Sequence, residues 1–409
     1  MAKGRQAFRV GISGSYGGLN LGDEAILEGI VKGLRRALPV EITVFSRNAD
    51  DTKARHEVER VVAVRKLSRD EVLPEVQRLD LLILGGGGIL FDGEAQIFLR
   101  EVMLAHEHRV PVMVYAVSAG PLKDRMAQGM VQEALGRAAV VTVRERDARR
   151  ILEEAGVHRE IVVTADPALL LEPEPLPKDA LKREGLDNGR QLVGVSVREP
   201  GAAAPDIGEA TYHKLLADAA DFMVDRYDAD VVFVPLEPKV LDVQQAHAVI
   251  AQMLRAQRAT VLKGDYTSGQ LVSLMRHFAF AVGMRLHFLI FASLQNVPFV
   301  ALPYAPKVGG FLDDLGIEMP PLQQVSAGRL IAHIDHAWDR RRMLQARIGR
   351  ALPALRERAL ETNDIAVRLL SQSVKSQPVK SQPAKSQPKS QPAKGQSAKS
   401  NAAVKSLAS

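Results

Sequence analysis

The chain has 409 residues, 46% of them hydrophobic, which is enough to bury the cores of two domains of ordinary size. It contains no cysteine, so a disulfide framework and a thiolate metal site are both excluded. The net charge of +6 comes from residues 371–409, which hold seven lysines and no acidic residue; the remainder, with 47 basic and 48 acidic side chains, is too neutral for a nucleic-acid-binding surface.

The first half of the chain alternates short apolar runs with helical patterns. We predict strands at Phe8–Ser13, Glu41–Phe45, Leu79–Leu84, Val112–Ala116, Val140–Val143 and Ile161–Thr164, and helices at Asp23–Ala37, Ala95–His106, Met126–Leu135 and Asp147–Glu154. Repeated strand–helix units whose strands are continuous in Val, Ile and Leu are typical of a parallel sheet covered on both faces. This N-terminal domain is expected to span residues 1–172.

The pattern restarts after a linker at 173–190 that begins with a Pro- and Glu-rich stretch. In a second domain at 191–370 we predict strands at Leu192–Val197, Val231–Pro235, Ala259–Leu262, Phe278–Val282 and Pro298–Leu302, and helices at Ala210–Arg226, Asp242–Gln257, Ser268–Arg276 and over most of Ser326–Leu370. The predicted fold class is therefore α/β, with two doubly wound, Rossmann-like domains facing each other across a cleft.

Residues 371–409 repeat K-S-Q-P with small variations, a composition typical of a disordered tail. An alternative role is attraction to an anionic membrane, worth up to about 1 kcal/mol for each lysine near the lipid. The N-terminus lacks the apolar segment of a signal peptide, and the most apolar run, Phe278–Leu302, is interrupted by polar residues. We expect a cytoplasmic protein, with peripheral contact at the inner membrane face and homo-oligomerisation left open.

A glycine-rich loop, SGSYGGLNLG, joins the first strand to the first helix. Such loops normally direct backbone N–H groups at an anion. Gly17 and Gly22 have the spacing of a phosphate-binding Walker A loop, but Asp23 and Glu24 follow where Lys and Ser/Thr are needed, which argues against an ATPase. The two acids suit either an ordinary helix N-terminus or the hydroxyls of a substrate, and Asn20 lies beside them.

A second glycine run follows the strand that ends at Leu84. Gly85–Gly88, including Gly86 and Gly87, either lets the backbone approach a ligand or packs tightly against the first loop, and both interpretations remain open. Asp92 comes shortly after it. In parallel sheets ligands bind beyond the carboxyl ends of the strands, so these positions belong to a candidate cleft.

Cationic residues also follow predicted strands, in both domains. Arg144 comes directly after one, Arg198 and Lys307 follow two others, and Arg285 and His287 interrupt the most apolar run. A buried arginine needs a carboxylate or a bound anion, so this pair indicates either a phosphate site or a structural ion pair beside a core histidine. The distribution favours a phosphorylated donor held by cations and a hydroxyl-bearing acceptor near Asp23 and Glu24.

Six segments together resemble the polysaccharide pyruvyltransferase family, in family order: SGSYGGLNLGDEAIL, GGGGILFD, VRERDARRIL, DPALLL, GVSVRE and GMRLHFLIFASLQNVPFVALPYAPKVGGFLDDLG. The chain is most similar to the cell-wall branch, which ketalates a sugar to anchor S-layer proteins. The resemblance implies a fold like that of GT-B glycosyltransferases and phosphoenolpyruvate as donor, without a further cofactor. Ala305 stands where many members have Asp. Because the sequence contains no metal-ligand spacing, we predict that the activity is independent of metal.

The resemblance places phosphoenolpyruvate at Arg144, His287 and Lys307, and the chemistry of ketal formation suggests the other roles. His287 is the expected general acid and Asp23 the group that orients or deprotonates the acceptor; phosphoenolpyruvate is expected to contact Arg144, Arg285, His287 and Lys307. The acceptor, an amino sugar such as N-acetylmannosamine of a lipid-linked glycan, is expected to lie near Gly17, Asn20, Gly22, Asp23, Glu24, Gly86, Gly87, Asp92 and Arg198. Two alternatives remain: a GT-B glycosyltransferase that uses a nucleotide sugar, and a non-catalytic carbohydrate-binding protein.

Overall fold

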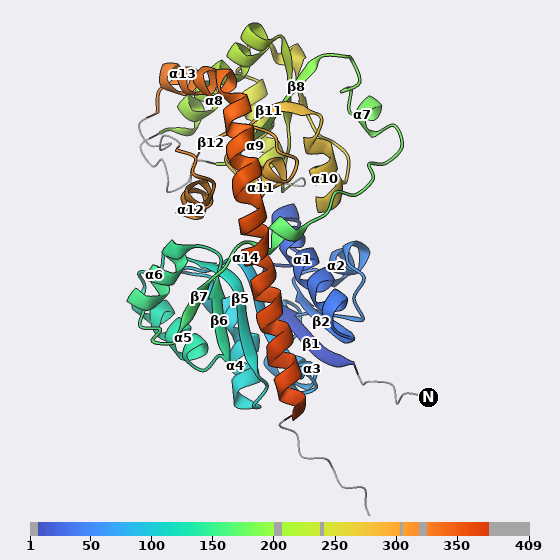
Figure 1. Ribbon diagram of the computed structural model, residues 1–409, viewed down its shortest axis with the longest axis vertical. Helices are drawn as coiled ribbons and strands as arrows, with labels where there is room; N and C mark the ends of the chain where they lie inside the picture. The colour runs from blue at the N-terminus through green and yellow to red at the C-terminus, as the bar shows by residue number, and fades with distance from the viewer. Residues whose placement is uncertain (1–6, 200–206, 238–240, 303–305, 319–324, 376–409) are drawn as a thin grey trace, which may run out of the picture.

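The computed structural model describes residues 7–199, 207–237, 241–302, 306–318 and 325–375. These ranges form two parallel sheets, one of seven strands in the order β3-β2-β1-β4-β5-β6-β7 and one of five in the order β10-β9-β8-β11-β12. The two sheets lie one above the other along the long axis, each with helices around it (Figure 1). The predicted two-domain α/β architecture is confirmed. Ala305 and the K-S-Q-P repeats lie outside the described residues.

In the N-terminal domain the strands are β1 (Phe8–Ser13), β2 (Val40–Ser46), β3 (Arg60–Ala63), β4 (Leu81–Leu90), β5 (Val112–Ala119), β6 (Val140–Val143) and β7 (Ile161–Val163). The helices are α1 (Leu21–Ala37), α2 (Ala49–Arg55), α3 (Arg69–Gln77), α4 (Ala95–Glu107), α5 (Arg125–Gly136) and α6 (Arg146–Glu154), with a short 3-10 turn, η1, at Pro167–Leu170. Three of these, α2, β3 and α3, were not predicted, because the edge strand is short and α3 buries only Val72 and Val76.

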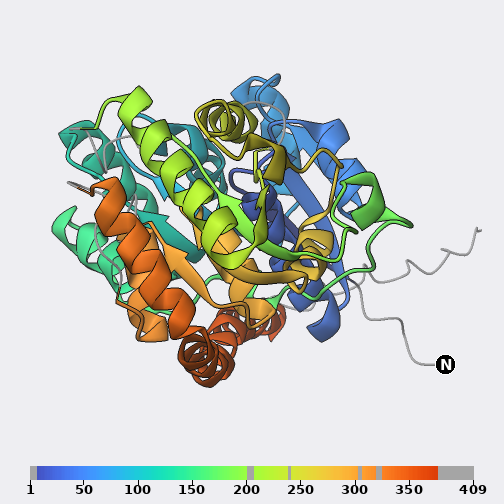
Figure 2. The same ribbon diagram turned by 90° about the horizontal axis from the view of Figure 1, so that it is seen from above.

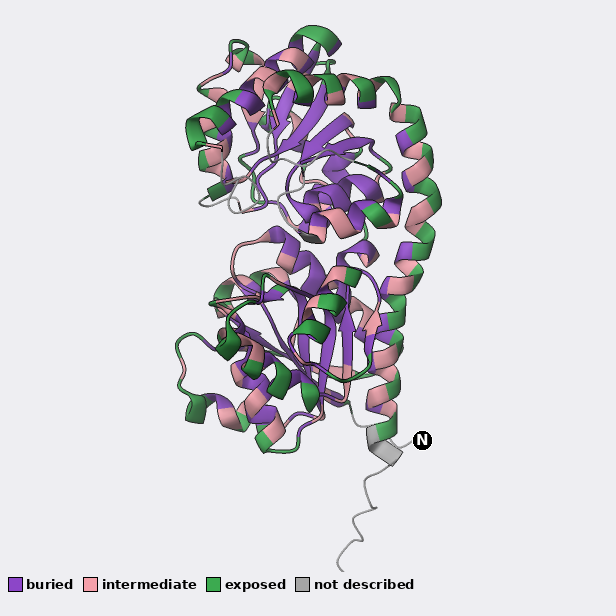
Figure 3. Ribbon diagram, turned by 90° about the vertical axis from the view of Figure 1, so that its left-hand side faces the viewer, coloured by how far each residue is buried: buried purple, intermediate pink, exposed green. Residues whose placement is uncertain are grey.

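The second domain contains β8 (Gln191–Ser196), β9 (Ala229–Phe233), β10 (Ala259–Val261), β11 (Phe278–Gly283) and β12 (Phe299–Ala301). Its helices are α7 (Ala180–Arg183), α8 (Glu209–Tyr227), α9 (Leu241–Ile250), α10 (Ser268–Met275), α11 (Leu286–Leu294), α12 (Pro306–Leu315) and α13 (Ala327–Asp339). The strands form the buried interior of each domain, and the helices expose their outer faces (Figure 3). Within the described ranges, no helix has a segment long and apolar enough to cross a bilayer.

The last helix, α14 (Arg341–Lys375), joins the two domains along one side of the molecule (Figures 1 and 3). Viewed from above it is seen nearly end-on beside them (Figure 2). Arg358 donates to the backbone oxygen of Thr164 at 2.5 Å in the first domain and to Asp314 at 2.9 Å in the second. Asn363 donates to the Gly33 oxygen at 3.3 Å. The helix thus packs on both domains and continues past residue 370, where the tail was expected to begin.

Gly85–Gly88 differ from the prediction, because they continue β4 instead of ending it and pair with β5. The missing side chains make room for the opening loop and α1. A Cβ on Gly85 would lie 2.2 Å from the Tyr16 hydroxyl, and one on Gly86 would lie 2.7 Å from Ile26. For these two positions the tight-packing interpretation is the one that the contacts support.

Candidate active site between the two domains

The opening loop, residues 14–20, lies where the two domains touch. The N–H of Leu21 donates to the Leu236 oxygen at 2.9 Å, and Ser268 Oγ donates to the Leu21 oxygen at 2.7 Å. Asn20 caps α1 by accepting from the Gly22 N–H at 3.0 Å, and its amide donates to Glu237 at 3.3 Å. These contacts fix the N-terminus of α1 against the second domain.

His287 lies directly against this N-terminus. It occupies the first turn of α11, after β11, and a Cβ built on Gly22 would lie only 2.0 Å from its Nδ1. The side chain is 12% exposed, and its Nε2 is 3.4 Å from Asp166 Oδ2. That Nε2 is buried and makes no hydrogen bond to any residue that the structure describes. Gly22 therefore creates the space for the imidazole, and the Nε2 of the ring faces Asp166.

Asp166 and Arg144 form a buried ion pair next to the imidazole. Arg144 Nη1 is 2.7 Å from Asp166 Oδ2, and Arg144 Nε is 3.1 Å from Glu145. Asp166 Oδ1 accepts from the Ala168 N–H at 2.9 Å. Burial opposes ionisation, but Arg144 and His287 hold the pKa of Asp166 well below its ordinary value. Asp166 is thus a fixed negative charge that can orient the imidazole.

Asp23 and Lys307 complete the cluster. Burial raises the pKa of Asp23, against the opposing effect of the positive charges of His287 and Lys307 and of a hydrogen bond from Ser15. A Cβ on Gly87 would lie 3.3 Å from Asp23 Oδ1, and one on Gly88 would lie 3.7 Å from Lys307 Nζ. The second half of the glycine run thus lies against this cluster, and Gly87 has a φ of +97°, a conformation that favours glycine.

Arg285, which was predicted to contact the donor, does not line the pocket that contains Arg144 and Lys307. Its guanidinium contacts both carboxylate oxygens of Asp242, with Nε at 3.1 and 3.2 Å, and Nη1 is 2.9 Å from Glu237. Asp242 also accepts from the N–H groups of Leu236 and Glu237 at 3.0 and 3.1 Å. The buried arginine is therefore compensated by carboxylates of its own domain, the structural ion pair that the sequence had left open.

Glu24 likewise serves the structure of the loop and does not face an acceptor. It is 2% exposed, accepts from the Gly17 N–H at 2.9 Å, and its other oxygen is 2.8 Å from His56 Nε2. Gly17 adopts a φ of +69°, and a Cβ there would lie 2.3 Å from Ser46 Oγ. Both residues therefore shape the turn, which corrects their placement at a substrate.

Two further predicted cleft residues are occupied by other contacts. Asp92 accepts from the N–H groups of Lys123 and Asp124 at 2.9 Å, just before α5. Arg198 pairs with the adjacent Glu199, and its carbonyl oxygen accepts from the Tyr212 hydroxyl at 2.5 Å.

Asp166 belongs to the segment DPALLL, but no role was predicted for it from the sequence. The rule that ligands bind beyond strand ends could have found it, since it follows β7 closely.

Residues 20–306 match the family described as polysaccharide pyruvyl transferase. The amylovoran biosynthesis protein AmsJ of Erwinia amylovora is 21% identical over 291 residues, which cover 68% of this chain and 70% of AmsJ.

Among solved structures, S. aureus MnaA with UDP has a TM-score of 0.61 at 12% identity, over 91% of this chain and 99% of that one. A putative UDP-N-acetylglucosamine 2-epimerase from Listeria monocytogenes has a TM-score of 0.62 at 12% identity, over 91% and 98%. At such identities the likeness shows the fold alone, which is the GT-B-like arrangement that was predicted. Since the family match covers most of the chain, the protein belongs to the polysaccharide pyruvyl transferase family and is a pyruvyltransferase.

Proposed function

We propose that the enzyme forms a pyruvate ketal on a glycan sugar, with phosphoenolpyruvate as donor and phosphate as the second product. The observation that carries the proposal is the meeting of Asp23, His287 and Lys307 with the Arg144–Asp166 pair where the domains touch. Cations, an imidazole and a carboxyl of raised pKa are the groups that this reaction requires.

The chemistry sets a task for each group. A proton must reach the methylene carbon of phosphoenolpyruvate, which leaves positive charge on C2. One sugar hydroxyl then adds to C2, and a second hydroxyl displaces phosphate, so two C–O bonds form and the C–O bond to phosphate breaks. Of the two hydroxyl protons released, one replaces the proton given to carbon and the other leaves with phosphate.

His287 is the general acid in this proposal. Histidine is the side chain most often used as a general acid, and the buried Nε2 of His287 faces the cluster. The ionised Asp166, 3.4 Å away, holds the ring in one orientation. Without this carboxylate the imidazole would be fixed only by its packing against Gly22.

Asp23 is the group that activates the acceptor. Burial raises the pKa of its carboxyl, which brings it closer to the value that suits a base near neutral pH. Its Oδ1 lies beside Gly87, where a Cβ would be 3.3 Å away, so the carboxylate borders the backbone of the glycine run.

Lys307 and Arg144 are the cations that would bind the carboxylate and phosphate of the donor. Arg144 is also paired with Asp166 and Glu145, so Lys307 carries the larger part of this role. Both cations line a narrow pocket that also contains Asp166, and its volume of about 20 Å³ has room for little more than one water.

For the acceptor we propose an amino sugar, such as N-acetylmannosamine, of a lipid-linked cell-wall glycan. The motifs shared with the cell-wall branch of the family support this choice. The lysine-rich segment 371–409 would be attracted to the anionic lipids of the cytoplasmic face of the membrane, which would bring the enzyme close to a lipid-linked acceptor.

The test is phosphate release from phosphoenolpyruvate by the full chain, with N-acetylmannosaminyl and N-acetylglucosaminyl disaccharides as acceptors. His287→Gln should abolish phosphate release, and His213→Gln should retain it, because His213 is a buried histidine that bonds to Gln245 at 2.7 Å outside the cluster. Phosphate release should be unchanged by EDTA, because we predict that the activity is independent of metal. Full activity of His287→Gln would contradict the proposed acid, and transfer of sugar from UDP-sugars would favour the glycosyltransferase alternative.

A further inference from the structure

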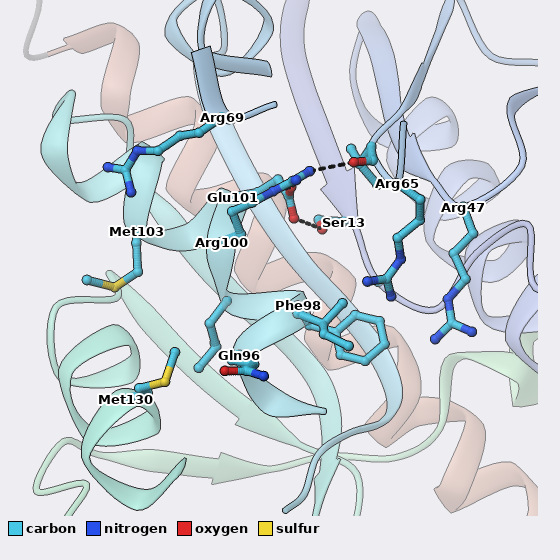
Figure 4. Close-up of a pocket in the computed structure, with 14 residues that line it drawn as sticks. Ser13, Arg47, Arg65, Arg69, Gln96, Phe98, Arg100, Glu101, Met103 and Met130 are labelled. Carbon is cyan, nitrogen blue, oxygen red and sulfur yellow. Dashed lines mark hydrogen bonds and ion pairs between the residues drawn. The ribbon is translucent and has the colours of Figure 1, made fainter. Parts of the chain in front are cut away.

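A second and larger pocket opens in the N-terminal domain, away from the cluster described above. It has a volume of about 550 Å³, and none of the five residues of the cluster lines it. Its wall is built from the end of β1 and the opening loop, from the residues that follow β2 and β3, and from one side of α4 (Figure 4). Because the carboxyl ends of parallel strands meet at one edge, the pocket lies at the edge where ligands bind in this fold.

The pocket is strongly basic, since four arginines and one glutamate line it. Two of the arginines have structural partners. Arg69 pairs with Glu107, and Arg100 donates to Glu101 at 2.7 Å and to the backbone oxygens of Val64 and Leu67 at 2.9 and 3.2 Å. Arg100 thereby neutralises Glu101, the acidic residue of the wall.

The other two, Arg47 and Arg65, lie side by side against one aromatic ring (Figure 4). Their guanidinium carbons are 5.4 and 5.7 Å from the centre of the Phe98 ring. The Nε of Arg47 is buried without a hydrogen-bond partner in the described part of the chain, and its ion pair with Glu94 is long, at 3.8 Å. Arg65 is exposed, but partial desolvation and the neighbouring charge of Arg47 still lower its pKa. Two guanidinium groups held together in this way are stabilised when an anion lies between them.

We propose that Arg47, Arg65 and Phe98 form a subsite for an oxyanion carried by the acceptor glycan. The inference rests on the proposed function, in which that glycan receives the pyruvyl group. The opening loop connects the two places: the Arg47 N–H donates to the Tyr16 oxygen at 3.0 Å, and a Cβ on Gly18 would lie 3.5 Å from Arg47 Nη1. An acceptor held at this subsite would extend along the loop toward Asp23.

Two kinds of acceptor glycan carry such an oxyanion. One has a diphosphate at its reducing end, and the other contains the carboxylate of a uronic acid. Calorimetric titrations with inorganic pyrophosphate and with D-glucuronate, each in saturating phosphoenolpyruvate, distinguish them. The variants are Arg47→Met/Arg65→Met and, as a matched control, Arg60→Met, which removes a β3 arginine that pairs with Glu75 outside the pocket.

Binding of one probe to the wild type should weaken at least about tenfold in the double variant and stay unchanged in Arg60→Met. The probe that binds identifies the oxyanion. Equal binding to the wild type and the double variant, or no binding of either probe, would overturn the inference. Phosphoenolpyruvate titrated alone should bind the wild type and the double variant equally. If it binds neither while pyrophosphate binding still depends on the two arginines, the proposed donor fails and the anion subsite stands.

Discussion

His287 lies so close to Gly22 that a Cβ on that glycine would be 2.0 Å from its Nδ1. The two residues belong to different domains, and each is at the N-terminal turn of a helix that points into the interface. The catalytic imidazole of the proposed mechanism is thus positioned by the absence of a side chain on the opposite domain.

Gly22→Ala should therefore inactivate the enzyme while folding remains intact. Displacement of His287 by about 1 Å is expected to lower kcat about 100-fold or more. The control is Gly129→Ala in α5, where a Cβ meets nothing within 4 Å and the helix should gain about 0.5–1 kcal/mol. Steady-state phosphate release and thermal unfolding of both variants check this. Wild-type kcat in Gly22→Ala would show that the imidazole position does not matter.

Asp23→Asn should make the protein more stable and less active. Burial raises the pKa of Asp23, so the folded state holds this proton more tightly than the unfolded chain, and the ionised carboxylate opposes folding at neutral pH. The gain in unfolding free energy should be largest at pH 7 and disappear as the pH falls below the ordinary value near 3.9. Activity should fall about 100-fold. Urea unfolding across this pH range would contradict the account if the variant were less stable at pH 7.

Asp166→Asn should have the opposite effect on stability. Its pKa is held well below the ordinary value, so the ionised carboxylate favours folding above pH of about 3.9, and this contribution is lost as the pH falls further. At neutral pH the loss should be about 3–5 kcal/mol, because the charge of Arg144 stays buried with one partner fewer. Asp147→Asn, an exposed position in α6, should stay within about 0.5 kcal/mol of the wild type. Denaturant titrations that find equal stability for both variants would refute the ion-pair argument.

Arg285→Met and Lys307→Met should separate folding from donor binding. Loss of Arg285 leaves the buried Asp242 uncompensated and should lower the unfolding free energy by about 3–5 kcal/mol, with the Kd for phosphoenolpyruvate unchanged in the folded fraction. Lys307→Met should raise that Kd about tenfold or more with little effect on stability. If both folded variants bound phosphoenolpyruvate equally weakly, Arg285 would be shown to belong to the donor site.

The alternation of apolar strands and helices was enough to predict both sheets, since continuous Val, Ile and Leu runs are required of strands buried on two faces. The polar stretch between β2 and β4 lacked that signal, so the edge strand β3 and its flanking helices were missed. The sequence predicts that the strand ends at Leu84, whereas β4 continues through Gly85–Gly88. Glycine is required within this strand because Tyr16 and Ile26, from elsewhere in the chain, occupy the space where side chains of Gly85 and Gly86 would lie.

At the site, the rule that ligands bind beyond strand ends was enough to bring Asp23, Arg144, His287 and Lys307 together. It could not assign partners to them. Whether a buried arginine holds a substrate or a carboxylate depends on long-range contacts, and Asp242 lies 43 residues from Arg285. The same limit applies to Glu24, whose partner His56 comes from the unpredicted segment after β2.

The central claim is that phosphoenolpyruvate binds the cationic cluster between the domains, and calorimetric titration of the full chain tests it most directly. The account predicts saturable binding of phosphoenolpyruvate to the wild type, weakened about tenfold or more in Lys307→Met, and no binding of UDP-N-acetylglucosamine. Saturable binding of UDP-N-acetylglucosamine without binding of phosphoenolpyruvate would contradict it.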